Sequence, residues 1–572
     1  ERLRFYILPL NNFDLTEELY VKMNARGKQL TSFENFKADL QHWLKENAAA
    51  LALNERSYGG RAMPYDMYFI NKMDNEWSQC FWRLQKDSED KNFDSLFFSF
   101  LYKYWLNEYI INSTGTNKGL DKEADFILLS EEPEYRGFCL FERHMSKALI
   151  ENMQVLLDKI YDCYDEIFET IQPCWSSGEE AKFDLLRGKL GLKERAAFCG
   201  AIMYLIKKDY DRDALANWMH IVWNIIENAN IDSWRVVAGV MQLLLELVEY
   251  SDDIYSGLAD DTVVIKSSQS KDTMSEERLK AQLIVSDPDW IEPLNIAEAH
   301  PYFKGSVSFL IPEDRDLAGF KHNYQMAEIF FDKNGISEKY RGGGHIFLRA
   351  LISKYRSLSE IKYHITDVRE KENSLKNMLA SDPVVRSSIK EWFALPTEKD
   401  ISKKLCDEVA KESLVPVEGN DFDKKFHEAL YKSTDLINWM QQQGAIRYRD
   451  NYVSRPASQQ DWIYVYGYRN EIIKALTERG WTCENRCYLR EGEMKQEIDY
   501  FWSSSVRDID VIKITSFKEQ EARIVCSIGR SELSITVNEE KIETFLYHEE
   551  VPDKSKVNSF IEKINACTNF CR

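Results

Sequence analysis

The stretch Leu19-Tyr-Val-Lys-Met-Asn-Ala-Arg-Gly-Lys-Gln-Leu-Thr31 decides how the beginning of the chain is expected to fold. It follows a strand-like run, Leu3 to Leu10, and precedes a helix-like run, Ser32 to Glu46. Gly27 stands where a short helix must end in the left-handed conformation, which glycine adopts at little cost. The spacing therefore predicts a strand, a short helix, a tight turn and a second helix over residues 1–48.

The second helix is expected to begin at a capping box. Thr31 and Glu34 are three residues apart, so the threonine hydroxyl can accept a hydrogen bond from the Glu34 amide while the glutamate reaches back. A reciprocal pair of this kind fixes the residue at which a helix begins, and the helix should therefore start at Ser32.

Four residues of the turn, Asn24, Arg26, Gly27 and Lys28, form a polar cluster that can face a bound anion. A glycine-relieved turn at a helix terminus lets backbone N–H groups and an arginine approach such an anion. The same residues also fit a structural turn in which Asn24 caps the helix and Arg26 is solvated. The residues alone leave both interpretations open.

This turn resembles a motif of the GmrSD-type family of bacterial restriction and phage-defence proteins. In that family a ParB/sulfiredoxin-like N-terminal domain ends in a helix reading roughly Phe-x-x-Ile-Asn-x-Arg/Thr-Gly-x-x-Leu. The residues that match this motif are Leu19, Tyr20, Met23, Asn24, Arg26, Gly27 and Leu30. Residues 1–48 are therefore expected to be the tail of such a domain.

A later pattern is also similar to large members of that family, so that the resemblance covers roughly residues 1–310. It begins with an acidic-basic segment, Glu276-Glu-Arg-Leu-Lys-Ala-Gln-Leu283. The residues that follow in the family's order are Trp290, Ile296, Glu298, His300 and Phe303-Lys-Gly305. Taken alone, the acidic pair beside Arg278 and Lys280 is typical of a solvent-exposed helix face.

Two signatures of the family do not occur in this sequence. The Asp-Gly-Gln-Gln-Arg strand-turn that lies upstream of the asparagine-glycine helix is absent, and no histidine stands in an HNH nuclease context. The chain begins with Glu1 inside a strand-like segment, so its true N-terminus is expected to lie upstream. The catalytic parts of the family are accordingly expected outside this chain.

The resemblance implies a component of a GmrSD-like restriction or anti-phage protein that recognises or cleaves foreign or modified DNA under nucleotide control. It implies NTP and Mg²⁺ as cofactors, DNA as a partner, and Asn24, Arg26, Gly27 and Lys28 as nucleotide-binding residues. The full-length form would be an NTP-dependent DNA endonuclease, whereas this chain alone is expected to be inactive.

Composition bounds these expectations. The chain has 572 residues, enough for three or four domains, and 44% hydrophobic residues, which excludes general disorder. Its formal net charge of −20 argues against a protein that coats nucleic acid, because such binding depends on phosphate neutralisation. Aromatic residues at helical spacing, as between Phe93 and Tyr109, indicate helix packing rather than base stacking.

The cysteines and the apolar runs bear on the compartment. Eleven cysteines without framework spacing, and no signal-like start, indicate reduced thiols in a cytoplasmic protein. The most apolar run, Leu96 to Ile111, is interrupted by Lys103, Asn107 and Glu108, so no membrane span is expected.

The expected fold is mainly α with α+β ends. Residues 49–250 should form a long helical bundle, residues 251–455 a second helical region, and residues 456–572 a C-terminal α+β domain with an antiparallel sheet. The segments of the bundle with apolar residues at three- and four-residue intervals are Tyr65–Leu84, Phe93–Ile111, Ala148–Ile171, Arg195–Ile206, Ala214–Ile226 and Trp234–Val248. The polar segment Ser251 to Asp272 is expected to be a linker or loop.

The C-terminal domain also carries acidic residues, Asp499 and Asp510, that loosely resemble a restriction-nuclease core. Such a core needs acidic groups for Mg²⁺ and a lysine near the scissile phosphate. Lys513 is three residues from Asp510, which places the two on opposite faces of a regular strand. His300 and His322 lack a second convergent histidine, so no metal site is assigned to the chain.

Three functional hypotheses follow. The first is the GmrSD-like component. The second is a non-catalytic helical scaffold or sensor that binds a protein partner or a second copy of the chain through an acidic helical surface. The third is a stand-alone nuclease that uses Asp499 and Asp510.

Overall fold

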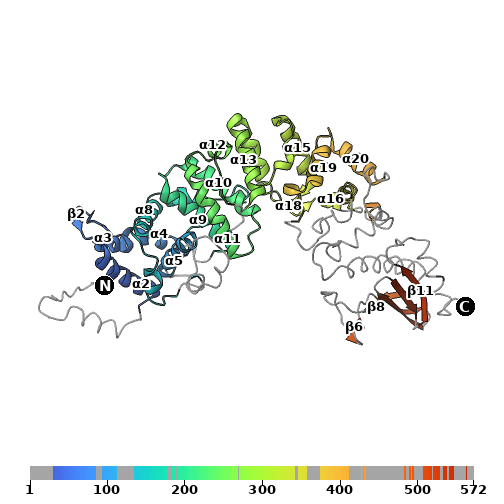
Figure 1. Cartoon of the computed structure of the whole chain (residues 1–572), viewed down its shortest axis with the longest axis horizontal. Helices are drawn as coiled ribbons and strands as arrows, with labels where there is room; N and C mark the ends of the chain where they lie inside the picture. The colour runs from blue at the N-terminus through green and yellow to red at the C-terminus, as the bar shows by residue number, and fades with distance from the viewer. Residues whose placement is uncertain are drawn as a thin grey trace, which may run out of the picture. The chain divides into compact units, whose positions relative to one another are not determined.

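The structure is a computed structural model that describes most of the chain up to residue 410 and the strands of the C-terminal part (Figure 1). The described residues are 30–85, 93–112, 126, 134–176, 182–186, 190–267, 270–341, 345–356, 374–410, 427, 431–432, 482–484, 489–490, 493–494, 507–517, 520–528, 532–537, 540–546 and 562. The chain divides into two compact units, unit 1 (Glu1–Ile291) and unit 2 (Glu292–Arg572). The fold is mainly helical with small antiparallel sheets, as expected.

The regular elements in the described part of unit 1 are helices, except for one hairpin. Its helices are α2 (Ser32–Asn47), α3 (Tyr65–Lys72), η2 (Met73–Trp77), α4 (Ser78–Gln85), α5 (Phe93–Asn112), α7 (Cys139–Glu142), α8 (Lys147–Thr170), α9 (Leu192–Lys207), α10 (Arg212–Asn228), α11 (Trp234–Leu247), η4 (Val248–Asp253), α12 (Ile254–Ala259), α13 (Lys271–Ser286) and η5 (Pro288–Trp290). The hairpin pairs β1 (Arg56–Tyr58) with β2 (Arg61–Met63) around Gly59 and Gly60, both at positive φ.

The six helical segments expected from apolar periodicity are confirmed. The expectation of a loop over Ser251 to Asp272 is wrong in part, because η4 ends and α12 forms within it. Helix α12 buries Ile254 and Leu258, and Asp253 caps it by accepting a hydrogen bond from the Ser256 amide. Such a short helix presents too few apolar residues for periodicity to mark it.

Aromatic side chains fill the core between α2 and α5. Phe36 lies 5.5 Å from Phe98, 5.7 Å from Trp105 and 4.9 Å from Phe141, ring centroid to ring centroid, mostly in tilted or edge-to-face pairs. Such pairs each add about 0.5–1.5 kcal/mol beyond the area they bury. The expectation that the aromatic residues after Phe93 serve helix packing is confirmed.

The core also holds a lysine from the middle of α5. Lys103 is 3% exposed, and its Nζ donates a hydrogen bond to the Leu185 carbonyl at 3.0 Å. The same Nζ lies 6.0 Å from the Phe100 ring centroid and 5.1 Å from that of Phe198. Burial, assisted by the positive charge of Arg195, lowers the pKa of Lys103 to about 7.

A π-helix, η2, joins α3 to α4 without a break in the helical run. Its Trp77 donates an indole hydrogen bond to Asp158 Oδ1 of α8 at 2.9 Å. Lys72 contacts the same carboxylate at 3.2 Å and also bonds Glu76. These contacts hold η2 against α8.

Helices α9 and α10 approach closely at Gly200. A β-carbon built on this glycine would lie 2.8 Å from one methyl carbon of Val222, closer than real β-carbons come, and 3.0 Å from the other. The indole of Trp218 donates to the Gly200 carbonyl at 2.9 Å. Glycine is thus required for the contact itself, since its own backbone angles are helical.

In unit 2 the regular elements described before the C-terminal strands are again helices, apart from the short hairpin of β3 (Phe331–Asp332) and β4 (Gly335–Ile336). The helices are α14 (Ile291–Glu298), η6 (Ser308–Leu310), α15 (Leu317–Phe330), α16 (Glu338–Arg341), α17 (Ile346–Ile352), α18 (Ser374–Ser381), α19 (Pro383–Phe393) and α20 (Glu398–Ala410). Buried Arg349 of α17 donates to the carbonyls of Tyr431 at 2.6 Å and Lys432 at 2.8 Å, which ties a distant segment to this helix.

The C-terminal strands form the expected antiparallel sheet. Its five strands follow the order β11 (Glu540–Leu546), β10 (Glu532–Val537), β9 (Gln520–Ile528), β8 (Arg507–Phe517) and β5 (Thr482–Glu484). A separate two-stranded ladder pairs β6 (Leu489–Arg490) with β7 (Glu493–Met494). Strands β8 to β11 pair consecutively, as hairpin connections produce.

The register of β8 against β9 corrects one expectation. Asp510 pairs with Val525 and Lys513 pairs with Arg523, because the register shifts by one residue between Asp510 and Ile512. Val525 and Arg523 are two residues apart, so Asp510 and Lys513 occupy register positions of the same face rather than opposite faces. Asp499 lies outside the described residues.

Candidate functional site

The expected nucleotide-binding residues Asn24, Arg26, Gly27 and Lys28 lie outside the described residues. The structure describes the chain from Leu30, and the helix that follows the turn begins as predicted. The Glu34 amide donates to Thr31 Oγ1 at 3.1 Å, and the Thr31 amide donates to Glu34 Oε2 at 2.7 Å. Thr31 Oγ1 also donates to Asp94 Oδ2 at 3.3 Å, so the cap joins α2 to α5.

The acidic-basic segment of α13 is not a solvent-exposed face, and that expectation is wrong. Glu277 is 1% exposed and Lys280 is 3% exposed, and their side chains form an ion pair of 2.6 Å. Buried Asn224 of α10 donates to the other carboxylate oxygen of Glu277 at 3.3 Å. Two charges withdrawn from water are tolerated when they are paired and hydrogen-bonded, as here.

Arg278 of the same segment fastens α13 to the residues before it. Its guanidinium donates to the carbonyls of Leu258 at 3.3 Å, Asp260 at 3.2 Å and Val263 at 2.5 Å. The segment therefore holds α12, the following turn and α10 together. A helical-wheel argument cannot detect this role, because charged residues pack inside only when the surrounding elements supply their partners.

The second segment of the resemblance forms the turn after α14. The Gly305 amide donates to the carbonyl of buried Glu298 at 3.1 Å, and Gly305 adopts a positive φ of 85°. His300 accepts a hydrogen bond from the Tyr302 amide through Nδ1 at 3.2 Å and stacks on Phe303. Burial lowers the pKa of His300 to about 4, so its neutral imidazole serves packing.

Neither His300 nor His322 belongs to a group of side chains that could bind a metal ion among the described residues. His322 Nε2 lies 2.9 Å from the Leu395 carbonyl. Within the described ranges, no three His, Cys, Asp or Glu side chains are grouped so that they could hold a metal ion. The same part of the chain contains no helix with both the length and the apolar character needed to cross a membrane.

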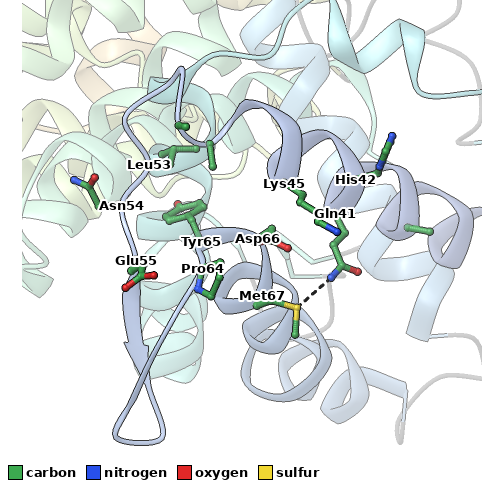
Figure 2. A pocket seen from close by; sticks show the side chains of 13 residues that line it. Gln41, His42, Lys45, Leu53, Asn54, Glu55, Pro64, Tyr65, Asp66 and Met67 are labelled. Carbon is green, nitrogen blue, oxygen red and sulfur yellow. Dashed lines mark hydrogen bonds between the residues drawn. The ribbon is translucent and has the colours of Figure 1, made fainter. Parts of the chain in front are cut away.

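The described residues of unit 1 line an open pocket of about 780 Å³ that sequence reasoning did not find (Figure 2). One wall is the exposed side of α2, with Gln41, His42 and Lys45. The other is the stretch from Leu53 through the hairpin to the first turn of α3, where Asp66 lies. The pocket forms where α2 packs beside α3, so no local sequence motif indicates it.

Comparison of the chain with protein-family models, with curated proteins and with solved structures finds no match.

Proposed function

We propose that this chain is a component of a GmrSD-like bacterial defence protein, in which a nucleotide controls the recognition or cleavage of foreign or modified DNA. The observation that supports the proposal is the ordered pair of motifs, Asn24 to Leu30 followed by Glu276 to Gly305. Residues of the second motif form a buried ion pair and a glycine turn, so they have structural roles in this chain.

In this proposal the Asn24-Ala-Arg-Gly-Lys28 turn contributes to an NTP site, with Mg²⁺ bound alongside the phosphates. Arg26 and Lys28 supply positive charge, and Gly27 allows the backbone to approach the phosphate groups. The capped start of α2 gives this turn a fixed attachment on its C-terminal side. The catalytic groups for DNA cleavage belong to parts outside the 572 residues, and residues 1–48 complete a ParB/sulfiredoxin-like domain.

The nucleotide role is tested by replacing Arg26. In the full-length protein, Arg26→Ala should weaken NTP binding at least tenfold in isothermal titration calorimetry while the melting temperature stays unchanged. Arg4→Ala removes the same charge outside the turn and should bind NTP as the wild type does. Equal NTP affinity in all three proteins would remove the turn from the nucleotide site.

The DNA role is tested by comparing the full-length protein with the 572-residue chain on modified and unmodified DNA, with Mg²⁺ and each NTP. Cleavage by the full-length protein alone is the expected result. Cleavage by both proteins, abolished by Asp499→Ala, would instead support a nuclease in the C-terminal part.

The alternative is a non-catalytic scaffold or sensor, which the net charge of −20 favours. It requires a stoichiometric complex with a protein partner or a second copy, measured by size-exclusion chromatography with light scattering. That complex would form without nucleotide or DNA.

A further inference from the structure

The pocket of unit 1 contains a buried carboxylate without an internal partner. Asp66 is 6% exposed and lines the pocket from the first turn of α3. Among the described residues it makes neither a hydrogen bond nor an ion pair. The neighbouring Tyr65 hydroxyl donates to Gln154 of α8 at 2.9 Å, so it is engaged elsewhere.

The position of Asp66 in its helix gives the side chain a favourable interaction but no partner. It is the second residue of α3, where the helix dipole stabilises a carboxylate by about 0.3–1 kcal/mol. A salt bridge to a bound cation would add more than this, because a partly buried ion pair is screened less than an exposed one. A ligand that brings a positive charge to the pocket would supply the partner that Asp66 lacks among the described residues.

The surroundings of Asp66 define the kind of cation. Buried Leu53 and Tyr65 line the same pocket and present apolar surface, while Lys45, His42 and Glu55 are exposed along it. Lys45 forms no ion pair with Asp66 in the described structure, and His42 is paired with Glu46 at 3.3 Å. The pocket thus joins one largely buried carboxylate to apolar walls, with charged groups near solvent.

A metal ion fits this arrangement poorly. Hard divalent cations take six or more oxygen ligands, whereas no group of three candidate side chains is so placed among the described residues. An organic cation needs only one carboxylate, because its hydrocarbon stem gains free energy by packing on the apolar wall.

We propose that the pocket between α2 and the first turn of α3 binds an organic cation, an ammonium or guanidinium group on an apolar stem, and that Asp66 pairs with its charge. The chemistry is shared by a lysine or arginine side chain of another protein and by a free aliphatic amine. Lys45 near the opening disfavours a second positive charge on the ligand, so a single cation is preferred to a polyamine.

The test is a ligand-observed NMR titration of the 572-residue chain with four probes. Nα-acetyl-lysine methylamide and Nα-acetyl-arginine methylamide present protein-like side chains, and n-butylamine represents a free aliphatic amine. Nα-acetyl-norleucine methylamide keeps the stem and lacks the charge. Binding of a lysine or arginine probe, with norleucine at least tenfold weaker, is the expected result. Stronger binding of n-butylamine than of either side-chain probe would assign the site to free amines.

Two variants and a matched control make the result specific. Asp66→Asn should weaken cation binding at least tenfold. Asp272→Asn removes an exposed aspartate from the same second position of another helix, α13, and should bind as the wild type does. Ala49→Trp should fill the pocket and weaken binding while leaving the carboxylate in place. Unchanged cation binding in Asp66→Asn, or equal binding of norleucine, would overturn the proposal.

Discussion

Replacing Lys103 with methionine should stabilise unit 1 at neutral pH. The lysine is enclosed by Phe100, Phe198 and the Leu185 carbonyl, and methionine keeps a similar unbranched stem without the amine. In the folded chain the pKa of Lys103 falls from 10.5 to about 7, so folding must release a proton that the unfolded chain keeps. Between about pH 7 and 10.5 folding therefore costs the free energy of releasing this proton, and below pH 7 it costs the free energy of burying the charged amine.

The size and sign of the effect follow from this pKa. At about 1.4 kcal/mol for each pH unit, burial of Lys103 costs roughly 4–5 kcal/mol at pH 7. The cost is constant at lower pH, because both states then hold the proton, and it disappears as pH rises toward 10.5. Methionine forfeits the hydrogen bond to Leu185, worth about 1–3 kcal/mol because its acceptor stays buried. A net gain of roughly 2–3 kcal/mol remains at pH 7.

The assay is urea unfolding followed by circular dichroism at pH 7, 8, 9 and 10. The difference in free energy of unfolding between Lys103→Met and wild type should shrink by roughly 3 kcal/mol across this range. Comparing the two proteins at each pH cancels all other titrating groups. Exposed Lys271, replaced in the same way, should give a constant difference. A constant difference for Lys103→Met as well would refute the inference that Lys103 folds without its proton.

Three further substitutions test contacts described above, each by the same urea unfolding. Thr31→Ala should cost about 1 kcal/mol by removing the cap of α2, and a loss no greater than for exposed Ser275→Ala would contradict the capping box. Glu277→Gln should cost about 3–5 kcal/mol, since it leaves the Lys280 charge buried, and Glu277→Leu combined with Lys280→Met should recover most of that loss. Gly200→Ala should cost about 1–3 kcal/mol through overlap with Val222, and unchanged stability would show that α9 and α10 can separate there.

Periodicity identified the six long helical segments of unit 1 because their buried faces repeat over several turns. The capping box was equally readable, since both of its residues act within four positions of the chain. Alternating residues in the C-terminal part indicated an antiparallel sheet, and the sheet is present. Each of these features depends on residues that are close together in the sequence.

The features that were missed depend on partners distant in sequence. The sequence pattern predicts that Glu277 and Lys280 are surface residues, because it does not show that Asn224 of α10 packs against them. An aspartate in a first helical turn is ordinary, and the isolation of Asp66 emerges only when α2 packs beside α3. The shared face of Asp510 and Lys513 depends on a bulge that strict alternation does not anticipate.

The π-helix η2 limits the insertions and deletions that unit 1 can tolerate between α3 and α4. The buried residues Tyr65, Phe69, Met73, Trp77 and Phe81 repeat every fourth position. An α-helix turns about 100° per residue, so a strict spacing of four would drift about 40° at each step and lead Phe81 away from the core. The wider turn of η2 opposes this drift. Losing one residue there would rotate α4 by about 100°, so the length of this segment should resist insertion and deletion more strongly than its composition resists substitution.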